Sequence, residues 1–474
     1  MSSIRPQISF LVQEQIDQIH HYSLEILAKT GIRVDSERAR KVFEKAIGKS
    51  IKDNLLHIPP ELVDWALTVA PSVVDIFNRS GELAFQLGDI PNSQTRFGTG
   101  VTNLYYQDPM TDEVTPFARK HMEITTRLGD TLSSFDVVST AGIIQDYPPE
   151  VADLYGTLEM VANTIKPLVV LVSDEHGLNT IFDLIEHLHG DLEQRPFCIP
   201  YFNPITPLVL NEGTTDKIMA TIERGLPFIY NSVGMAGATS PITLAGTLTL
   251  LNAELLAGLV FSQVVKEGTP IVLGSLAVDF DMKNMQGYYT PRILPLNLAC
   301  AELMAYYGLP HSGSSGSGLG WGADLLGSAT LWMNHLTSCL GKVGLAPFVG
   351  GRFESLVFSS AFTVYANEVV RQARLYGNGF QLDDESVTLN EIEAIGPGGN
   401  FLAADQTVKL CRKTNFTAGI WPYLSLDQWQ AEGKPKADDL LRQHTRGLLN
   451  NLTAPDDHDE LIAKGEAFIT KVTS

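Results

Sequence analysis

Aromatic side chains recur near the ends of several short apolar runs in this chain. Phe97, Tyr201, Tyr230 and Phe348 each lie close to the end of such a run, and Tyr105 follows soon after the first. The face of an aromatic ring attracts a cation by roughly 0.5 to 2 kcal/mol, depending on how completely water is excluded. Several such rings at one place would select a quaternary ammonium ligand. Each ring is also compatible with ordinary packing in a core.

A histidine and a glycine-rich segment follow another apolar run. His311 is flanked by small residues, which suits either ligand binding or a hydrogen bond to a loop carbonyl. The segment Ser312–Gly322, with Gly316, Gly318 and Trp321 inside it, lacks the Gly-Lys-Ser/Thr ending of a phosphate-binding loop. It indicates a flexible rim loop, or one that a large flat ligand approaches closely.

Patterns for metal binding and nucleophilic catalysis are weak. His187 and His189 diverge at the end of an expected helix, which favours a solvated helix end over a metal site. No Gly-x-Ser-x-Gly turn is present. The four cysteines are far apart, so they indicate neither a zinc ribbon nor a disulfide framework, and they fit a reducing cytoplasm; they are Cys198, Cys300, Cys339 and Cys411.

The elements that must position these residues alternate between short β-rich runs and helical patterns. Eight strands, each followed by a helix, predict a (β/α)8 barrel. The competing open doubly wound sheet usually carries a Gly-x-Gly-x-x-Gly turn, which Phe97-Gly-Thr-Gly100 is not. The expected strands are 95–100, 137–141, 168–173, 197–203, 228–233, 270–275, 309–314 and 347–351. The expected helices are 121–130, 150–164, 178–189, 214–224, 244–265, 295–306, 323–340 and 354–375.

In such barrels the chemistry takes place at the carboxyl ends of the strands. That rule selects a set of residues before any other argument is made. The set comprises Phe97, Thr99, Thr140, Ser173, Tyr201, Asn203, Tyr230, Asn231, Ser275, His311, Ser312, Phe348, Arg352 and Glu354.

Composition and organisation limit the class of protein. We expect an N-terminal helical cap over residues 1–90, the barrel over 91–380, and a C-terminal helical and irregular extension over 381–474. A formal net charge of −20 argues against a nucleic-acid partner. The apolar helix expected at 244–265 is interrupted by polar residues, so the sequence predicts no membrane span and no signal peptide.

Four blocks of the sequence resemble the trimethylamine:corrinoid methyltransferase superfamily, and they occur in the family's order. They are Phe97-Gly-Thr-Gly100, Gly234-Met-Ala-Gly-Ala-Thr-Ser-Pro-Ile-Thr-Leu-Ala-Gly-Thr247, Ala305-Tyr-Tyr-Gly-Leu-Pro310 and Ile395-Gly-Pro-Gly-Gly-Asn-Phe-Leu402. The resemblance implies a barrel enzyme that moves a methyl group from an amine to the cobalt of a separate corrinoid protein. Trimethylamine-specific members carry pyrrolysine at a position that corresponds to Phe348 or a close neighbour, and this chain has none.

The resemblance is therefore to the non-pyrrolysine branch, which implies a quaternary amine substrate. Glycine betaine, giving dimethylglycine, is the simplest expectation; carnitine, proline betaine and choline-like substrates are alternatives. The substrate site is expected to include the aromatic residues Phe97, Tyr201, Tyr230 and Phe348. If the substrate carries a carboxylate, then His311, Asn231 or Arg352 would bind it, and Arg352 offers the best geometry for an anion.

The corrinoid is expected on a partner protein, because the chain lacks the Asp-x-His-x-x-Gly signature of domains that bind it. Ser312, Gly316, Gly318 and Trp321 would then face the macrocycle and the partner. We expect no bound metal, a cytoplasmic location and a possible homo-oligomer. Two other hypotheses remain: a zinc-dependent methyltransferase barrel, and a non-catalytic binding protein built on the same barrel.

Overall fold

A parallel β-sheet forms the centre of the computed structural model, which describes residues 2–91, 93–173, 177–190, 192–314, 316–414 and 419–473. Seven strands lie in the order β15-β13-β11-β10-β9-β6-β18, and each neighbouring pair is parallel. The strands are β6 (Arg96–Thr99), β9 (Val137–Ser139), β10 (Leu168–Val170), β11 (Cys198–Phe202), β13 (Phe228–Ser232), β15 (Ile271–Ser275) and β18 (Leu345–Val349). All seven lie within or beside the ranges that the sequence predicts.

The two edge strands β15 and β18 both bond to the same segment, residues 310–313. The Leu273 amide donates to the Pro310 carbonyl (3.0 Å), and the Ser312 amide donates to the Leu273 carbonyl (2.9 Å). On the other side, the Leu345 amide donates to the His311 carbonyl (3.0 Å). This is the segment in which the sequence predicts the seventh of eight strands.

An apolar layer fills the space inside the curved sheet. Its strand residues occur at alternate positions, as expected where successive side chains point to opposite faces; they are Val137, Val169, Ile199, Ile229, Val272 and Leu345. A hairpin of β4 (Val73–Phe77) and β5 (Leu83–Gly88) covers this layer with Val74, Ile76, Phe85 and Leu87. The expected N-terminal helical cap over 1–90 must therefore be corrected for residues 73–88, which form a hairpin and whose apolar residues alternate with a period of two.

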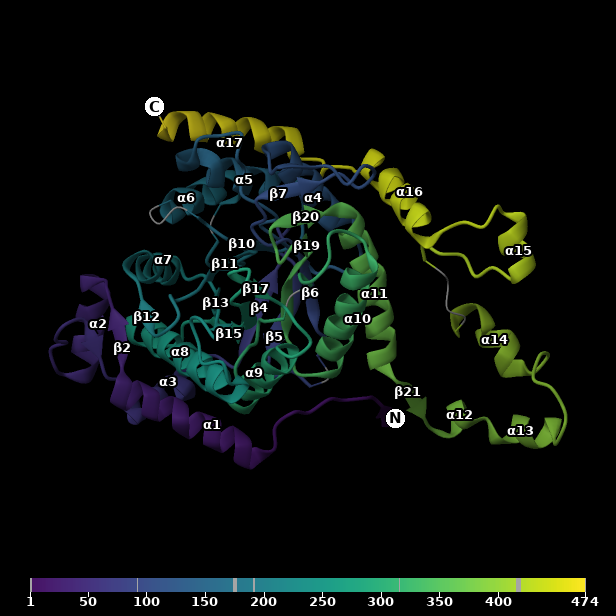
Figure 1. Ribbon diagram of the computed structural model, residues 1–474, viewed down its shortest axis with the longest axis horizontal. Helices are drawn as coiled ribbons and strands as arrows, with labels where there is room; N and C mark the ends of the chain where they lie inside the picture. The colour runs from purple at the N-terminus through teal and green to yellow at the C-terminus, as the bar shows by residue number, and fades with distance from the viewer. Residues whose placement is uncertain are drawn as a thin grey trace.

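Helices follow the strands and pack on the outer face of the sheet (Figure 1). They are α4 (Arg119–Thr131), α5 (Pro149–Asn163), α6 (Leu178–His189), α7 (Glu212–Glu223), α8 (Leu244–Val265), α9 (Leu294–Tyr306), α10 (Leu325–Leu340) and α11 (Ser360–Asn378). The last begins six residues later than expected, because residues 353–359 form a turn and the short strand β20 (Val357–Ser359). Helix α8 is long and apolar enough to cross a membrane, but most of it is buried inside the protein.

The N-terminal helices cover α8 from outside. They are α1 (Gln13–Glu25), which continues as one π-helical turn η1 (Ile26–Thr30), α2 (Glu37–Ile47) and α3 (Pro60–Val69). Apolar side chains such as Phe43 join the same core as Phe261 of α8, with ring centroids 5.4 Å apart. A small sheet of β12 (Val209–Leu210), β2 (Ile32–Val34) and β3 (Leu55–Leu56) connects this layer to the loop between β11 and α7.

Two further small sheets lie beyond the carboxyl ends of the central strands. One comprises β19 (Gly351–Arg352), β20, β7 (Tyr105–Gln107) and β8 (Val114–Pro116). The other comprises β14 (Met235–Ala236), β16 (Val278–Asp281) and β17 (Gln286–Tyr288). Both small sheets therefore lie on the side of the central sheet where the sequence predicts the functional site.

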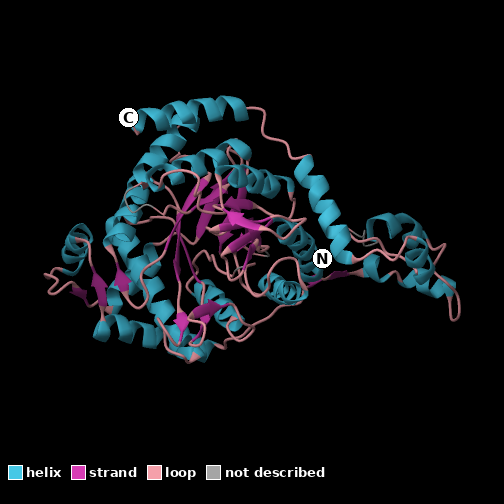
Figure 2. Cartoon of the chain, turned by 45° about the horizontal axis from the view of Figure 1, so that its top comes forward, coloured by secondary structure: helices cyan, strands magenta, loops and turns pink. Residues whose placement is uncertain are grey.

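The C-terminal part of the chain leaves the body and returns to it. After β21 (Phe380–Leu382), which pairs with β1 (Ser2–Ile4), come α12 (Asp384–Val387), α13 (Leu389–Ile395), α14 (Asp405–Thr414) and α15 (Leu426–Ala431). Both views show these helices projecting from the body (Figures 1 and 2). Helices α16 (Ala437–Asn450) and α17 (His458–Val472) then pack back on α11 and α5.

Candidate functional site

Tyr201 of β11 and Phe348 of β18 meet inside the curved sheet near its carboxyl edge. Their ring centroids are 5.0 Å apart and the rings are nearly perpendicular, at 81°. Asn231 of β13 lies fully buried beside them. Both polar atoms of its side chain lack a hydrogen-bond partner of normal geometry among the described residues. Burial raises the pKa of the Tyr201 hydroxyl, so the phenol stays protonated and can donate.

A carboxylate approaches the same region on a turn in an uncommon conformation. Phe353, Glu354 and Ser355 have consecutive positive φ angles of 49°, 53° and 73°. Such conformations cost roughly 1–3 kcal/mol each and concentrate at functional sites. The Glu354 carboxylate accepts the Tyr289 amide at 2.9 Å through one oxygen, while its other oxygen is buried without a hydrogen bond among the described residues. Burial raises the pKa of Glu354, and the Arg352 charge opposes that rise.

Tyr289 links the carboxylate to the ring pair. Burial, followed by the nearby Glu354 charge, raises the pKa of its hydroxyl. The Tyr289 hydroxyl in turn contributes to the raised pKa of Tyr201. The carboxyl edge of the sheet therefore gathers three aromatic rings, one buried carboxylate and one buried amide.

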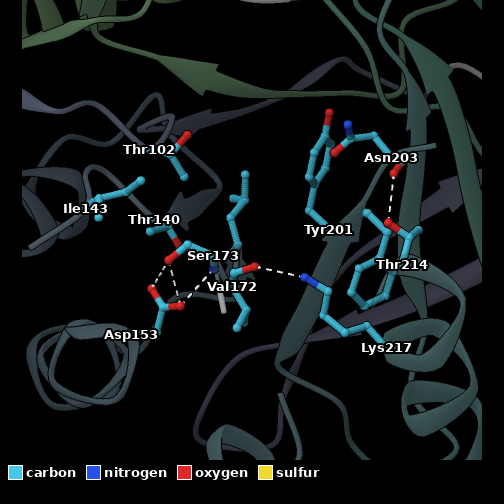
Figure 3. A pocket seen from close by; sticks show the side chains of 12 residues that line it. Thr102, Thr140, Ile143, Asp153, Val172, Ser173, Tyr201, Asn203, Thr214 and Lys217 are labelled. Carbon is cyan, nitrogen blue, oxygen red and sulfur yellow. Dashed lines mark hydrogen bonds between the residues drawn. The ribbon is translucent and has the colours of Figure 1, made fainter. Parts of the chain in front are cut away.

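A cavity of about 240 Å³ opens beside Tyr201, at the carboxyl ends of β9, β10 and β11 (Figure 3). Ser173 donates to Asp153 at 2.8 Å, and the Lys217 ammonium donates to the Val172 carbonyl at 3.2 Å. The cavity therefore combines polar groups with apolar side chains, among them Leu171 and Phe202. It is lined by Thr102, Thr140, Ile143, Asp153, Leu171, Val172, Ser173, Tyr201, Phe202, Asn203, Thr214 and Lys217.

Strand-end reasoning had selected four residues that the cavity brings together: Thr140, Ser173, Tyr201 and Asn203. It missed Asp153 and Lys217, which come from α5 and α7 and carry no signal in the sequence beyond their charge. It also missed Tyr289, which follows the β16–β17 hairpin rather than a central strand.

Three of the predicted substrate residues lie on the outer face of the sheet instead. Phe97 packs against His335 of α10, with ring centroids 5.0 Å apart. Tyr230 lies so close to α8 that a Cβ added to Gly258 would be 2.2 Å from its ring. His311 lines a separate cavity of about 650 Å³, and burial lowers its pKa to about 3. A one-residue difference along a strand moves a side chain to the opposite face.

Arg352, expected to bind a substrate carboxylate, is used by the protein itself. Its guanidinium donates to the Leu319 carbonyl at 2.7 Å and to the Gly351 carbonyl at 2.9 Å. It also lies 3.6 Å from the centre of the Phe362 ring. These contacts fasten the glycine-rich loop to the first turn of α11.

The glycine-rich loop is a packed segment rather than a flexible rim. Ser312 bonds into the sheet between the two edge strands, and the Gly316 amide donates to the Phe348 carbonyl at 2.9 Å. A Cβ at Gly316 would lie 2.7 Å from the Val349 side chain. Gly318 is also buried, whereas Trp321 is 66% exposed at the surface.

The histidine pair makes ring contacts within the body. His187 lies 5.2 Å from the Phe468 ring, and His189 lies 5.0 Å from Phe197. Within the described ranges, no three His, Cys, Asp or Glu side chains come together as metal ligands.

Comparison with known proteins gives the chain its family. The family described as trimethylamine methyltransferase (MTTB) matches residues 1–474. The trimethylamine methyltransferase MttB of Desulfitobacterium hafniense is 28% identical, over 95% of this chain and 91% of that protein. A glycine betaine methyltransferase of the same species is 26% identical, over 99% of this chain and 98% of that protein.

A solved structure supports the fold. The monomethylamine methyltransferase of Methanosarcina barkeri superposes with a TM-score of 0.54, at 8% identity, over 95% of this chain and 89% of that one. At this identity the likeness concerns the mixed α/β fold alone. The family match extends over the whole chain, and so the chain belongs to the trimethylamine methyltransferase family and is a corrinoid-dependent methyltransferase.

Proposed function

We propose that this protein transfers a methyl group from a quaternary amine, most simply glycine betaine, to the Co(I) corrinoid of a separate protein. The observation that carries the proposal is the Tyr201–Phe348 ring pair, which Tyr289 links to the partly buried Glu354 carboxylate. The resemblance implies that Phe348 or a close neighbour stands where trimethylamine-specific members of the family carry pyrrolysine. Rings and a carboxylate suit a permanent cation, which hydrogen-bond donors alone do not recognise.

We propose that the sheet closes into an eight-stranded (β/α)8 barrel. Hydrogen bonds from residues 310–313 to both β15 and β18 support closure, as does the parallel pairing of β18 with β6. In a closed barrel, Tyr201 and Phe348 lie across the axis from one another at the active end. The expected three-part division of the chain, at residues 90 and 380, is retained in this proposal.

The proposed methyl transfer requires little acid–base catalysis from this chain. A quaternary nitrogen already carries the positive charge and leaves as a neutral amine, so no general acid is needed. The corrinoid supplies the nucleophile, and the residues here position the methyl group and exclude water. Asn231, whose side-chain amide lies on the inner face within reach of the Tyr201 hydroxyl, replaces His311 and Arg352 as the group proposed to bind a substrate carboxylate.

The surface around the carboxyl edge fits a partner that brings the corrinoid. Trp321, Leu325, Met282 and Met285 are exposed apolar side chains on loops and helix starts around the opening. We propose that they contact the corrinoid protein, whereas the buried loop residues Ser312, Gly316 and Gly318 only shape the surface beneath. We also retain the proposal of a cytoplasmic location; all four cysteines are free.

The test is methyl transfer to Co(I) cobalamin, followed by the absorbance of methyl-Co(III). We expect transfer from glycine betaine, and we expect Phe348→Leu to raise the KM for the amine at least tenfold. Phe97→Leu, the same change on the outer face, should lower stability without changing KM. Absence of transfer from glycine betaine, carnitine, proline betaine and choline alike would refute the proposal.

A further inference from the structure

The segment from β21 to the end of α15 forms an arm that lacks a core of its own. None of the described side chains between residues 374 and 440 is buried. The arm touches the body again at Trp421, whose ring lies 5.8 Å from Tyr365 of α11. A segment of this length in water cannot offset its lost conformational entropy without burying apolar surface.

The arm nevertheless exposes many large apolar side chains. Leu402 is 83% exposed and Val408 is 66% exposed. Leu389, Ile392, Phe401 and Leu426 are exposed as well. Isolated exposed side chains need no explanation, but this many on one segment that lacks a core indicate a surface that another molecule covers.

The tip of the arm is also depleted of charge. Residues 395–404, which include the block Ile395–Leu402, contain no charged side chain, whereas 19% of the whole chain is charged. Loss of charge at the centre of a patch is typical of the core of an interface. The barrel site uses none of these residues, so the catalytic reaction leaves this block unexplained.

The base of the arm is a two-stranded ribbon with open edges. β1 and β21 pair antiparallel, Ile4 opposite Phe380, and the described residues supply no third strand. A lone two-stranded ribbon is marginal in water. An open antiparallel edge is complementary to itself about a twofold axis, so a second copy of the same ribbon satisfies it.

We propose that the arm is a dimerisation element, in which two copies of this chain pack arm against arm and ribbon against ribbon about a twofold axis. The six side chains are 44–83% exposed, so at roughly 110 Å² each the apolar surface exposed on the arm amounts to about 650 Å² per copy. Two copies would bury about 1,300 Å², which lies at the lower end of the range for a stable interface. A permanent second copy also suits an apolar surface better than a corrinoid protein that must dissociate after each transfer.

The experiment is light scattering of the full chain alone, with no corrinoid protein present. We expect a mass twice that of the 51.8 kDa chain. Leu402→Asp, at a side chain exposed in the single copy, should keep the fold by circular dichroism. It should also raise the dimer dissociation constant by at least about a hundredfold. Leu83→Asp, the same change at a leucine that is 52% exposed in the β4–β5 hairpin, should leave the dimer intact.

Hydrogen exchange gives a second measurement. The amides of α13 should exchange slowly in the wild-type dimer and quickly in Leu402→Asp. A wild-type monomer at tens of micromolar would overturn the proposal. So would a dimer that Leu402→Asp leaves unchanged, or one that both substitutions disrupt equally. Because methyl transfer is not measured, failure here is independent of the proposed substrate.

Discussion

At the scale of single residues, Glu354 has the arrangement best suited to a cation. Its backbone lies in the left-handed region between two other left-handed residues. One carboxylate oxygen is held by the Tyr289 amide, and the other is buried without a hydrogen bond from the described residues. Burying an oxygen without a hydrogen bond raises the free energy of the free enzyme, and a cationic substrate bound beside it would offset that rise.

Replacing Glu354 by Gln should therefore weaken substrate binding more than catalysis. We expect Glu354→Gln to raise KM for glycine betaine about tenfold, equivalent to ~1.4 kcal/mol. We expect kcat to hold or rise, because the positive charge on nitrogen falls during transfer and the carboxylate stabilises the reactant more than the transition state. Burial raises the pKa of Glu354, so acidification through that raised pKa should increase KM in the wild type only.

The measurement is initial rates against amine concentration across a pH series. Glu61→Gln, at the exposed start of α3, is the matched control and should change neither constant. A loss of kcat at unchanged KM would show instead that Glu354 acts in the chemical step.

At the scale of elements, Arg352 has a structural role, although its residue type suggests a ligand for a substrate carboxylate. Its guanidinium joins the glycine-rich loop, β19 and α11 through two carbonyls and one aromatic ring. Guanidinium donates in several fixed directions at once, which an ammonium group cannot do. The loop can therefore be rich in glycine and still be well packed.

Arg352→Lys should consequently reduce stability rather than substrate affinity. We expect the free energy of unfolding to fall by about 2 kcal/mol, since a hydrogen bond from a charged group contributes ~1.5–3 kcal/mol. Urea denaturation measures this, with Arg38→Lys in an exposed ion pair as a near-neutral control. If Arg352→Lys instead increased KM and left stability unchanged, Arg352 would be a substrate-binding residue.

Strands and helices were largely predictable from the sequence, but the direction of individual side chains was not. Hydrophobic runs and their spacing located the seven strands of the sheet and most of the helices around it. A strand end alone does not say which of two neighbours faces inward, so Tyr230 and Asn231 were both expected in the site, yet they lie on opposite faces. The sequence predicts a helix from Glu354 onward, whereas the structure has a turn there. Phe353, Glu354 and Ser355 adopt positive φ angles, and none of them is a glycine that would indicate such a turn.

At the scale of the whole molecule, the β4–β5 hairpin and the C-terminal helix α17, which are far apart in the sequence, hold each other in place. Arg79, in the β4–β5 turn and only 6% exposed, donates to Asp457 just before α17, at 2.5 and 2.8 Å. It also donates to the Thr164 carbonyl after α5, at 3.1 Å. The β4–β5 hairpin, the end of α5 and the start of the C-terminal helix α17 thus share one guanidinium.

Removing the charge of Asp457 should loosen this junction. Asp457→Asn leaves Arg79 buried with a weaker partner, and we expect the free energy of unfolding to fall by about 1–2 kcal/mol, a value reduced because the carboxylate is half exposed. The hydrogen bond from Arg79 lowers the pKa of Asp457. Its contribution is therefore complete above the ordinary Asp pKa of about 4 and is lost as the pH falls through the lowered value. The difference in the free energy of unfolding between wild type and variant, measured by urea denaturation, should therefore become smaller in acid.

The control is Glu460→Gln, in an exposed pair with Lys464, which should change the free energy of unfolding by less than about 0.5 kcal/mol. A difference of the same size at every pH would mean that the carboxylate charge is not what joins the hairpin to α17.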